Sequence, residues 1–186
     1  MSEGIRIRRA GGEPDVAEAL TDVLLDVVDG GASVGFMSPL SRGRAVAFWQ
    51  GVLASAARGE RILMVAADVS TGTMFGTVQV VLAMPDNQPH RAEVAKMLVR
   101  RSARRRGIGA ALMRAAEVAA HEAGKTVLVL DTATGSDAER LYTKLGWQHC
   151  GVIPDYALLP QGGLCSTTVF YRLLKAGESA YGPLPG

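Results

Sequence analysis

The sequence has few cysteines, few aromatic residues and almost no net charge. Cys150 and Cys165 are its only cysteines and neither belongs to a CxxC pair, so we expect reduced thiols and no metal site. Aromatic residues make up 5% of the 186 residues and the formal net charge is +2, whereas nucleic-acid-coating proteins carry a wide excess of positive charge. No segment approaches the ~20 apolar residues of a membrane span, and the first residues lack a signal-peptide core. We therefore expect a cytoplasmic protein with no nucleic-acid or membrane partner.

The composition is otherwise that of a packed domain, with 48% hydrophobic and 20% charged residues. We expect a single domain over residues 1–175 and a loose Gly/Pro-rich tail over 176–186. Hydrophobic periodicity alternates between strand-like and helix-like segments, which predicts an α/β fold. The expected strands are 5–10, 61–68, 73–83, 91–99, 126–132, 148–153 and 166–174. The expected helices are 15–28, 44–57, 107–123 and 136–144.

Three of these segments carry detailed expectations. Strict alternation in the strand 91–99 would place Glu93, Ala95, Met97 and Val99 on one face and Val94, Lys96 and Leu98 on the other. The apolar run 126–132 predicts a strand that is covered on both faces. The helix that begins near residue 107 should bury a stripe formed by Ile108, Ala111, Leu112, Ala115, Val118 and Ala119.

Five arginines lie within the seven residues 100–106, and Gly107-x-Gly109 follows them at the start of a helix. A helix N-terminus exposes unpaired N–H groups and about half a positive charge. Glycine lets a ligand approach the backbone closely, so the segment predicts a cradle for a phosphate or pyrophosphate. It does not fit GxGxxG, because position 112 is Leu, and a solvated loop is the alternative interpretation.

The context of this turn resembles the GCN5-related N-acetyltransferase (GNAT) superfamily. Arg104-x-x-Gly107-x-Gly109 follows a strand that ends in MLV, and the segments VLVLDT and AERLYTKLGW come after it. The resemblance covers Arg91 to Trp147 and extends more loosely from Arg61 to Leu174. It implies the GNAT fold: a mixed sheet of six or seven strands, helices on both faces, and a parallel strand pair splayed around the cofactor.

The resemblance also implies acetyl-coenzyme A (acetyl-CoA) as cosubstrate. The pyrophosphate would be held by the turn residues Arg104, Arg105, Arg106, Gly107, Ile108 and Gly109. The pantetheine arm would meet backbone groups of Met97, Leu98 and Val99 on a bulged strand. Arg100 and Arg101 could reach the 3′-phosphate or remain solvated, and we expect Phe48 and Trp49 to serve packing.

Acetyl transfer requires a neutral amine and a protonated leaving thiolate, so a general base and a general acid are useful. Glu93 is the first candidate for the base, Asp131 the second and His90 the third. Tyr142 matches the tyrosine of the family's LYxKxGF segment, which implies a general-acid role, since a phenol with a pKa of about 10 is protonated at neutral pH. Gly135 stands where many members have Asn, and Ser136 is its possible replacement.

Several functions remain open from the sequence. The first is an N-acetyltransferase acting on a primary amine of a small molecule. Weaker resemblance of HRAEVAKMLV, LVLDT and GVIPDYALLP to tabtoxin-resistance acetyltransferases suggests an amino-acid-like antimetabolite as acceptor. The alternatives are a protein N-terminal or lysine acetyltransferase, an acyl-CoA-binding sensor without turnover, and a nucleic-acid-binding module. Family members are often dimers, so a homodimer is also expected.

Overall fold

The computed structural model describes residues 4–13 and 15–174, so the predicted tail, 176–186, lies outside the described residues. The elements follow one another along the chain as β1 (Ile5–Arg9), α1 (Val16–Asp29), α2 (Arg42–Ala57), β2 (Arg61–Asp68), β3 (Met74–Val81), β4 (Arg91–Val99), a short 3₁₀ turn η1 (Arg101–Ala103), α3 (Ile108–Glu122), β5 (Val127–Ala133), α4 (Asp137–Lys144), β6 (Gln148–Leu158) and β7 (Leu164–Leu173).

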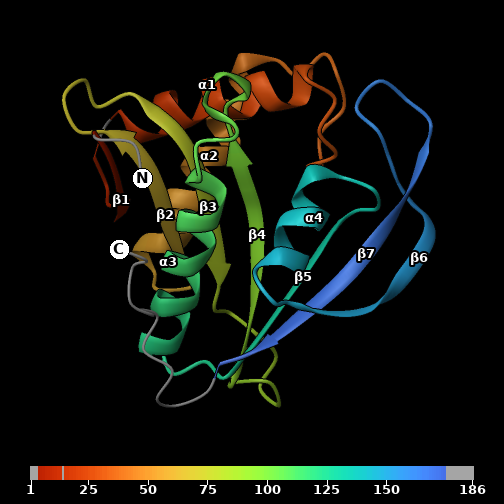
Figure 1. Ribbon diagram of the computed structural model, residues 1–186. Helices are drawn as coiled ribbons and strands as arrows, with labels where there is room; N and C mark the ends of the chain where they lie inside the picture. Colours follow the sequence, from red (N-terminus) through yellow and green to blue (C-terminus); the bar gives the residue numbers. More distant parts are fainter. Residues whose placement is uncertain (1–3, 14, 175–186) are drawn as a thin grey trace, which may run out of the picture.

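The strands form one seven-stranded sheet in the order β1-β2-β3-β4-β5-β7-β6 (Figure 1). Every neighbouring pair is antiparallel except β4 and β5, which are parallel. The connection between these two strands runs through α3. This arrangement confirms the predicted α/β fold with a mixed sheet and one parallel pair.

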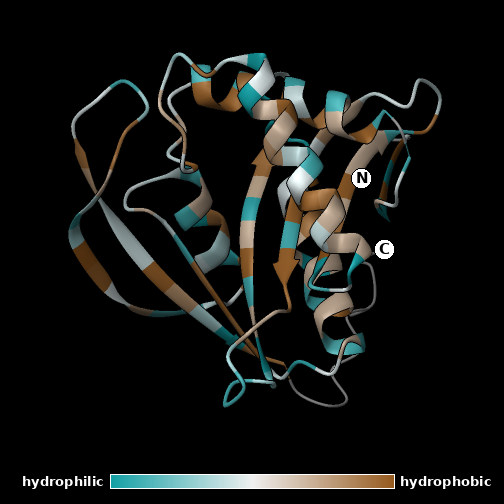
Figure 2. Ribbon diagram, turned by 180° about the vertical axis from the view of Figure 1, so that it is seen from behind, coloured by the Kyte–Doolittle hydropathy of each residue, from teal (hydrophilic) through white to brown (hydrophobic). Residues whose placement is uncertain are grey.

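Two hydrophobic cores lie on opposite faces of the sheet. The first joins α1 and α2 to β2, β3 and β4, and the second joins α3 and α4 to the other face. Hydrophobic segments run along the central strands, while the helices alternate hydrophobic with hydrophilic residues (Figure 2). Trp49 lies in the first core and is fully buried, which agrees with the packing role expected for it.

The predicted stripe of α3 is partly wrong. The side chains that are buried are Ile108, Leu112, Met113, Ala116 and Ala120, whereas Val118 is 40% exposed. Alanine is distributed around the whole helix, so apolar spacing alone did not define which side faces the sheet. The i, i+4 spacing of the larger buried residues places the stripe about one position away from the predicted one.

Strand β4 contains a bulge that strict alternation does not predict. Thr77 pairs with Leu98 and Gln79 with Ala95, so three steps on β4 oppose two on β3. The extra residue falls at Lys96, whose φ is +50°. Beyond the bulge, Met97 and Val99 join the α3 core while Leu98 joins the α1 core. The predicted faces of β4 are therefore wrong from Lys96 onward.

The prediction that β5 is covered on both faces is also wrong. Leu128 and Leu130 are buried in the α3 core, but Asp131 on the other face is exposed. The helices α1 and α2 pack on β2, β3 and β4 and do not extend over β5. The sheet is thus open on its α1 side where β5 and β7 lie.

Candidate active site

The site is built around the point where β4 and β5 separate. The two strands pair only from Arg91 to Glu93 on β4 and from Val127 to Val129 on β5. Further on, β4 stays paired with β3 up to Val99, and β5 stays paired with β7 up to Ala133. The facing edges of the two strands are therefore left without a strand partner, a common way for a sheet to bind an extended polar ligand. Met97, Leu98 and Val99 lie on the β4 edge, where backbone contacts to the pantetheine arm were predicted.

The turn after β4 brings the backbone to the start of α3. Arg105 and Gly107 adopt positive φ angles of 64° and 77°, and Gly107 precedes Ile108, the first residue of the helix. No side chain caps this helix, so its first N–H groups remain available to a ligand. A Cβ atom on Gly107 would meet nothing within 4 Å, so space lies open in front of the helix end.

Gly109 has a different environment from Gly107. A Cβ atom there would lie 3.0 Å from Cδ2 of Leu141 and 3.7 Å from Sδ of Met97. The start of α3 thus packs closely against α4 and the bulged part of β4. Because Gly109 has no Cβ atom, the three elements can approach one another closely, and a ligand can also approach the backbone there.

The five arginines do not act as one basic surface. The backbone N–H of Arg101 donates to Asp26 of α1 at 2.7 Å and its guanidinium pairs with the same carboxylate at 2.9 Å. Arg100 pairs with Asp22 at 3.4 Å, and the guanidinium of Arg106 lies 5.2 Å from the ring centroid of Phe75. Arg100 and Arg101 therefore anchor the turn to α1, which neither interpretation of their roles anticipated.

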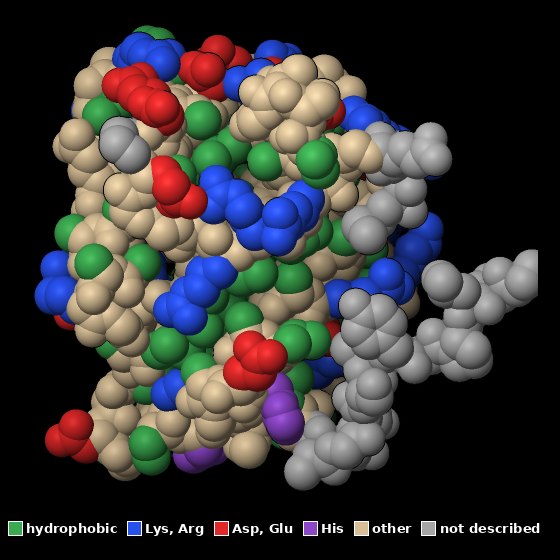
Figure 3. All heavy atoms as spheres, turned by 90° about the vertical axis from the view of Figure 1, so that its left-hand side faces the viewer, with side chains coloured by type: hydrophobic (Ala, Val, Ile, Leu, Met, Phe, Trp, Pro, Cys, Tyr) green, Lys and Arg blue, Asp and Glu red, His purple; other side chains and the backbone are tan. Residues whose placement is uncertain are grey.

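Arg104 and Arg105 are exposed. Arg140 lowers the pKa of Asp137 at the start of α4, and the charges of Arg104 and Arg105 lower it further. On the face that Figure 3 presents, Lys and Arg side chains form separate groups interrupted by hydrophobic and acidic ones. A continuous basic surface, as nucleic-acid binding requires, is absent from that view.

Tyr142 projects from α4 into the α3 core and is 5% exposed. Its ring packs against Trp147 and Phe170, each at a centroid distance of 6.1 Å. Burial, and secondarily the negative charge of Asp131, raise the pKa of Tyr142 above its ordinary value. The hydroxyl therefore keeps its proton at neutral pH, as a general acid must.

The helix that carries Tyr142 begins as predicted. Oγ of Ser136 accepts from the backbone N–H of Glu139 at 3.1 Å, and the Glu139 carboxylate accepts from the N–H of Gly135. This confirms the Ser136 half of the expected capping box, whereas the Glu139 carboxylate binds the N–H one residue before the cap. Gly135 has a φ of +79°, and Oγ of Ser136, besides capping α4, lies 3.3 Å from Oγ1 of Thr132, so a replacement of the missing Asn by Ser136 stays a prediction.

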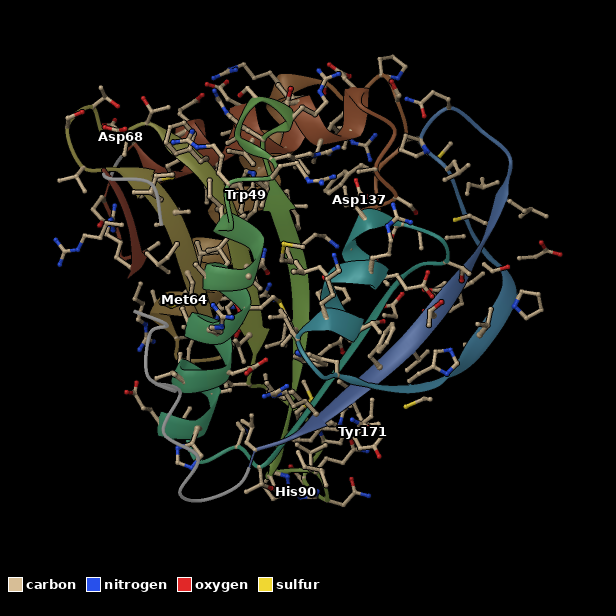
Figure 4. All side chains as sticks on the ribbon, viewed as in Figure 1. Trp49, Met64, Asp68, His90, Asp137 and Tyr171 are labelled. Carbon is tan, nitrogen blue, oxygen red and sulfur yellow. The ribbon has the colours of Figure 1, made fainter. Side chains whose placement is uncertain are left out.

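Glu93 and Asp131 lie on the face of the sheet opposite to Tyr142. Glu93 is the last β4 residue that pairs with β5, and it is exposed. Val129 is the β5 residue that pairs with Glu93, and Asp131 lies two residues further along β5. Oδ2 of Asp131 accepts a hydrogen bond from Oγ1 of Thr167 at 2.8 Å. His90 precedes β4 and lies at the opposite end of the sheet from Asp137 (Figure 4). The structure thus brings Glu93 and Asp131 to the opening and leaves His90 distant from it.

Lys96 is a charged residue at the opening that the sequence did not assign to the site. It occupies the bulge on the face that carries Glu93 and Asp131, whose charges both act on it. A lysine inside the apolar segment VAKMLV was the available signal. Strict alternation placed Lys96 on one face with Val94 and Leu98, and its position in the bulge could not be read from the residues.

Two loops meet at the outer end of the sheet. The loop between α1 and α2 runs beside the turn between β6 and β7 (Figure 1). Ser38 donates its N–H to the carbonyl of Pro160 at 2.9 Å, and the side chain of Gln161 reaches the carbonyl of Val28 at 3.5 Å. Phe36 of the first loop stacks edge-on against Phe48 at 5.1 Å. The two loops are therefore joined into one wall.

A sheet split between β4 and β5, with a glycine turn and helix at the split, defines an acyl-CoA-binding transferase fold. The sequence matches the acetyltransferase (GNAT) family over residues 36–147, more than half of the chain, and the chain belongs to this family. It is an acetyl-CoA-dependent N-acetyltransferase.

Solved structures share this fold at low sequence identity. An N-acetyltransferase of the same superfamily from Kribbella flavida is 23% identical, with a TM-score of 0.77 over 94% of this chain and 100% of that one. Ribosomal-protein-alanine N-acetyltransferase from Brucella melitensis is 22% identical, with a TM-score of 0.77 over 91% and 99%. The Salmonella typhimurium protein yncA, solved with its cofactor acetyl-CoA, is 18% identical, with a TM-score of 0.76 over 97% and 100%.

The residues at the split fit acetyl-CoA. The uncapped start of α3 and the open space before Gly107 suit a pyrophosphate, and the unpaired β4 edge suits the amide groups of a pantetheine arm.

Among the described residues, no helix is long and apolar enough to cross a membrane.

Proposed function

We propose that this chain transfers the acetyl group of acetyl-CoA to a primary amine of a small molecule by direct attack of the amine. The observation that carries the proposal is the split between β4 and β5, with Glu93 and Asp131 on one face and Tyr142 on the other. One proton must leave the amine and another must reach the thiolate. A base and an acid on opposite faces of one opening suit this pair of transfers.

Glu93 is the proposed general base, and Asp131 the alternative. An alkyl ammonium with a pKa of about 10.4 is charged at neutral pH, so it must lose a proton before it attacks. Glu93 is exposed at the point where the strands part, which lets it accept this proton directly or through water. Asp131 already accepts a hydrogen bond from Thr167, and it is equally suited to orient the ammonium by charge.

Tyr142 is the proposed general acid. When bound, acetyl-CoA supplies the acetyl group as an activated thioester. A thiol has an ordinary pKa of about 8.5, so a tyrosine that keeps its proton can donate it to the departing thiolate. A backbone N–H on the free β4 edge between Met97 and Val99 would polarise the thioester carbonyl. The turn residues Arg104 to Gly109 would hold the pyrophosphate through backbone groups and the exposed guanidinium groups of Arg104 and Arg105.

The joined loops favour a small acceptor over a folded protein. Hydrogen bonds between Ser38 and Pro160 and between Gln161 and Val28 join the two loops at the outer end of the proposed acceptor face. An extended protein terminus or a surface lysine would need that end open. A protein acceptor remains the second candidate, and a homodimer in the cytoplasm remains a prediction.

The test is thiol release from acetyl-CoA with a panel of small amines and a panel of N-terminal peptides. We expect turnover with small amines, and Tyr142→Phe should lower kcat by about 10²- to 10⁴-fold while acetyl-CoA affinity stays unchanged. Tyr156→Phe is the matched control, because Tyr156 is 55% exposed on β6. Full kcat in Tyr142→Phe would remove the general-acid role, and turnover with peptides alone would remove the small-molecule acceptor.

A further inference from the structure

Lys96 is a half-buried cation without a direct partner. None of the ion pairs among the described residues includes it, and no hydrogen bond between described side chains or backbone groups ends at its Nζ atom. Burial lowers the pKa of Lys96, while the negative charges of Asp131 and Glu93 act in the opposite direction. A desolvated charge without a hydrogen-bonded counterion is unfavourable in a folded protein.

The backbone at Lys96 is strained as well. Its φ of +50° is rarely adopted by a residue with a side chain. Such strain persists only where the surrounding structure enforces it, and it gathers at functional sites. The bulge directs Lys96 to the face that carries Glu93 and Asp131.

The Nζ atom of Lys96 reaches toward the loop between α1 and α2. It lies 3.5 Å from the position that a Cβ atom on Gly35 would occupy. This is the loop that Ser38 fastens to Pro160 of the β6–β7 turn. The ammonium therefore stands between the proposed proton acceptors and the wall that closes the acceptor face.

Another cation near Lys96 is already engaged. The guanidinium of Arg61 donates to Oε1 of Gln79 at 2.6 Å and to Oγ of Ser55 at 2.9 Å. These hydrogen bonds occupy its donors within the protein. Lys96 makes no such contact among the described residues, so its ammonium remains available to a ligand. Two carboxylates and one available ammonium match an acceptor that carries one positive and one negative group.

We propose that Lys96 binds a carboxylate of the acceptor, so that the acceptor is a small amino acid with its amine directed to Glu93 and Asp131. This inference rests on the proposed function and adds the acceptor's second charged group. A purely cationic amine would be repelled by Lys96. Removal of the carboxylate from the acceptor would leave Lys96 uncompensated.

The experiment compares amino acids with matched amines. Each α-amino acid of a panel is paired with its carboxamide, which keeps the amine and the side chain but lacks the negative charge. The kcat/KM of both members is measured for the wild type, Lys96→Met and Lys96→Arg. Lys144→Met is the matched control, because Lys144 is exposed on α4. Calorimetric binding of acetyl-CoA verifies that each variant is folded and loaded.

We expect the wild type to prefer the amino acid and Lys96→Met to lose this preference by a factor on the order of ten to one hundred, mainly through KM. Lys96→Arg should retain part of it and Lys144→Met all of it. An unchanged preference in Lys96→Met overturns the inference, and so does a wild type that uses both members equally. If Lys96→Met fails to fold, Lys96→Arg supplies the variant comparison, and a wild type that uses both members equally still overturns the inference. If neither the amino acids nor the carboxamides cause thiol release from acetyl-CoA, the proposed function itself is refuted.

Discussion

A single methyl group on Gly107 should separate cofactor binding from stability. Gly107 and Gly124 lie just outside the two ends of α3, both have a φ of +77°, and in both a Cβ atom would meet no protein atom within 4 Å. Gly107→Ala and Gly124→Ala therefore impose the same backbone strain without a steric clash. They differ in what lies beyond them, because only Gly107 faces the proposed pyrophosphate site.

The strain sets the expected loss of stability. An alanine in the left-handed region costs about 1–2 kcal/mol. For a chain of this size each kcal/mol lowers Tm by about 2–4 °C, so both variants should melt about 2–8 °C lower than the wild type. The acetyl-CoA affinity of Gly107→Ala should fall by at least about tenfold, or about 1.4 kcal/mol, because the methyl group blocks approach to the first N–H groups of α3.

Differential scanning calorimetry and isothermal titration with acetyl-CoA measure the two quantities. Equal acetyl-CoA affinities in the two variants would refute the assignment of the pyrophosphate to this turn. Valine is the less informative substitution. At Gly107 a β-branched residue adds strain to a φ of +77°, and at Gly109 even a Cβ atom approaches Leu141 to 3.0 Å.

Two other predictions concern Gly76 on β3 and Glu117 on α3. A Cβ atom on Gly76 would lie 2.5 Å from the carbonyl oxygen of Leu98, so Gly76→Ala should lower the free energy of unfolding by about 1–3 kcal/mol. Gly151→Ala is the control, because a Cβ atom there would meet nothing within 4 Å, and it should leave the free energy of unfolding unchanged. Urea denaturation measures both variants. Burial raises the pKa of Glu117, although the charge of Arg172 lowers it in part. The stability that the Glu117 carboxyl group contributes is therefore fully present below its unfolded pKa, and it is lost as the pH rises through the raised folded pKa. The wild type should therefore exceed Glu117→Gln in free energy of unfolding by more at pH 4 than at pH 7, and the opposite order would contradict this environment.

Much of the fold could be predicted because local patterns and packing agree. The bounds of β2 and β4 match the expected 61–68 and 91–99, and the cap at Ser136 opened α4 as expected. The family resemblance implied a bulge in β4, but the residues themselves could not show where it lies, because only the pairing with β3 reveals the inserted residue. Lys96 was overlooked for the same reason.

A local motif singled out Gly107, Gly109 and Tyr142. The structure places the two glycines at the start of α3 and buries Tyr142 in the α3 core, and the roles of all three stay predictions. The partners of Arg100 and Arg101 could not be predicted, because Asp22 and Asp26 lie more than seventy residues earlier on α1. A contact between residues so far apart in the chain produces no periodic pattern in the sequence, so a single sequence does not predict it. Arg100 and Arg101, expected to be solvated or to reach a 3′-phosphate, instead anchor the turn to α1.

The bulge at Lys96 links the two halves of the site. By inserting one residue into β4 it turns Met97 and Val99 toward the α3 core, where they meet the start of the helix that would hold the cofactor. The same insertion places the Lys96 side chain on the opposite face, beside the acids that would serve the acceptor. A straight strand could not do both, since its side chains alternate strictly. Deleting Lys96 should therefore disturb cofactor binding as well as acceptor selection, whereas Lys96→Met should disturb selection alone.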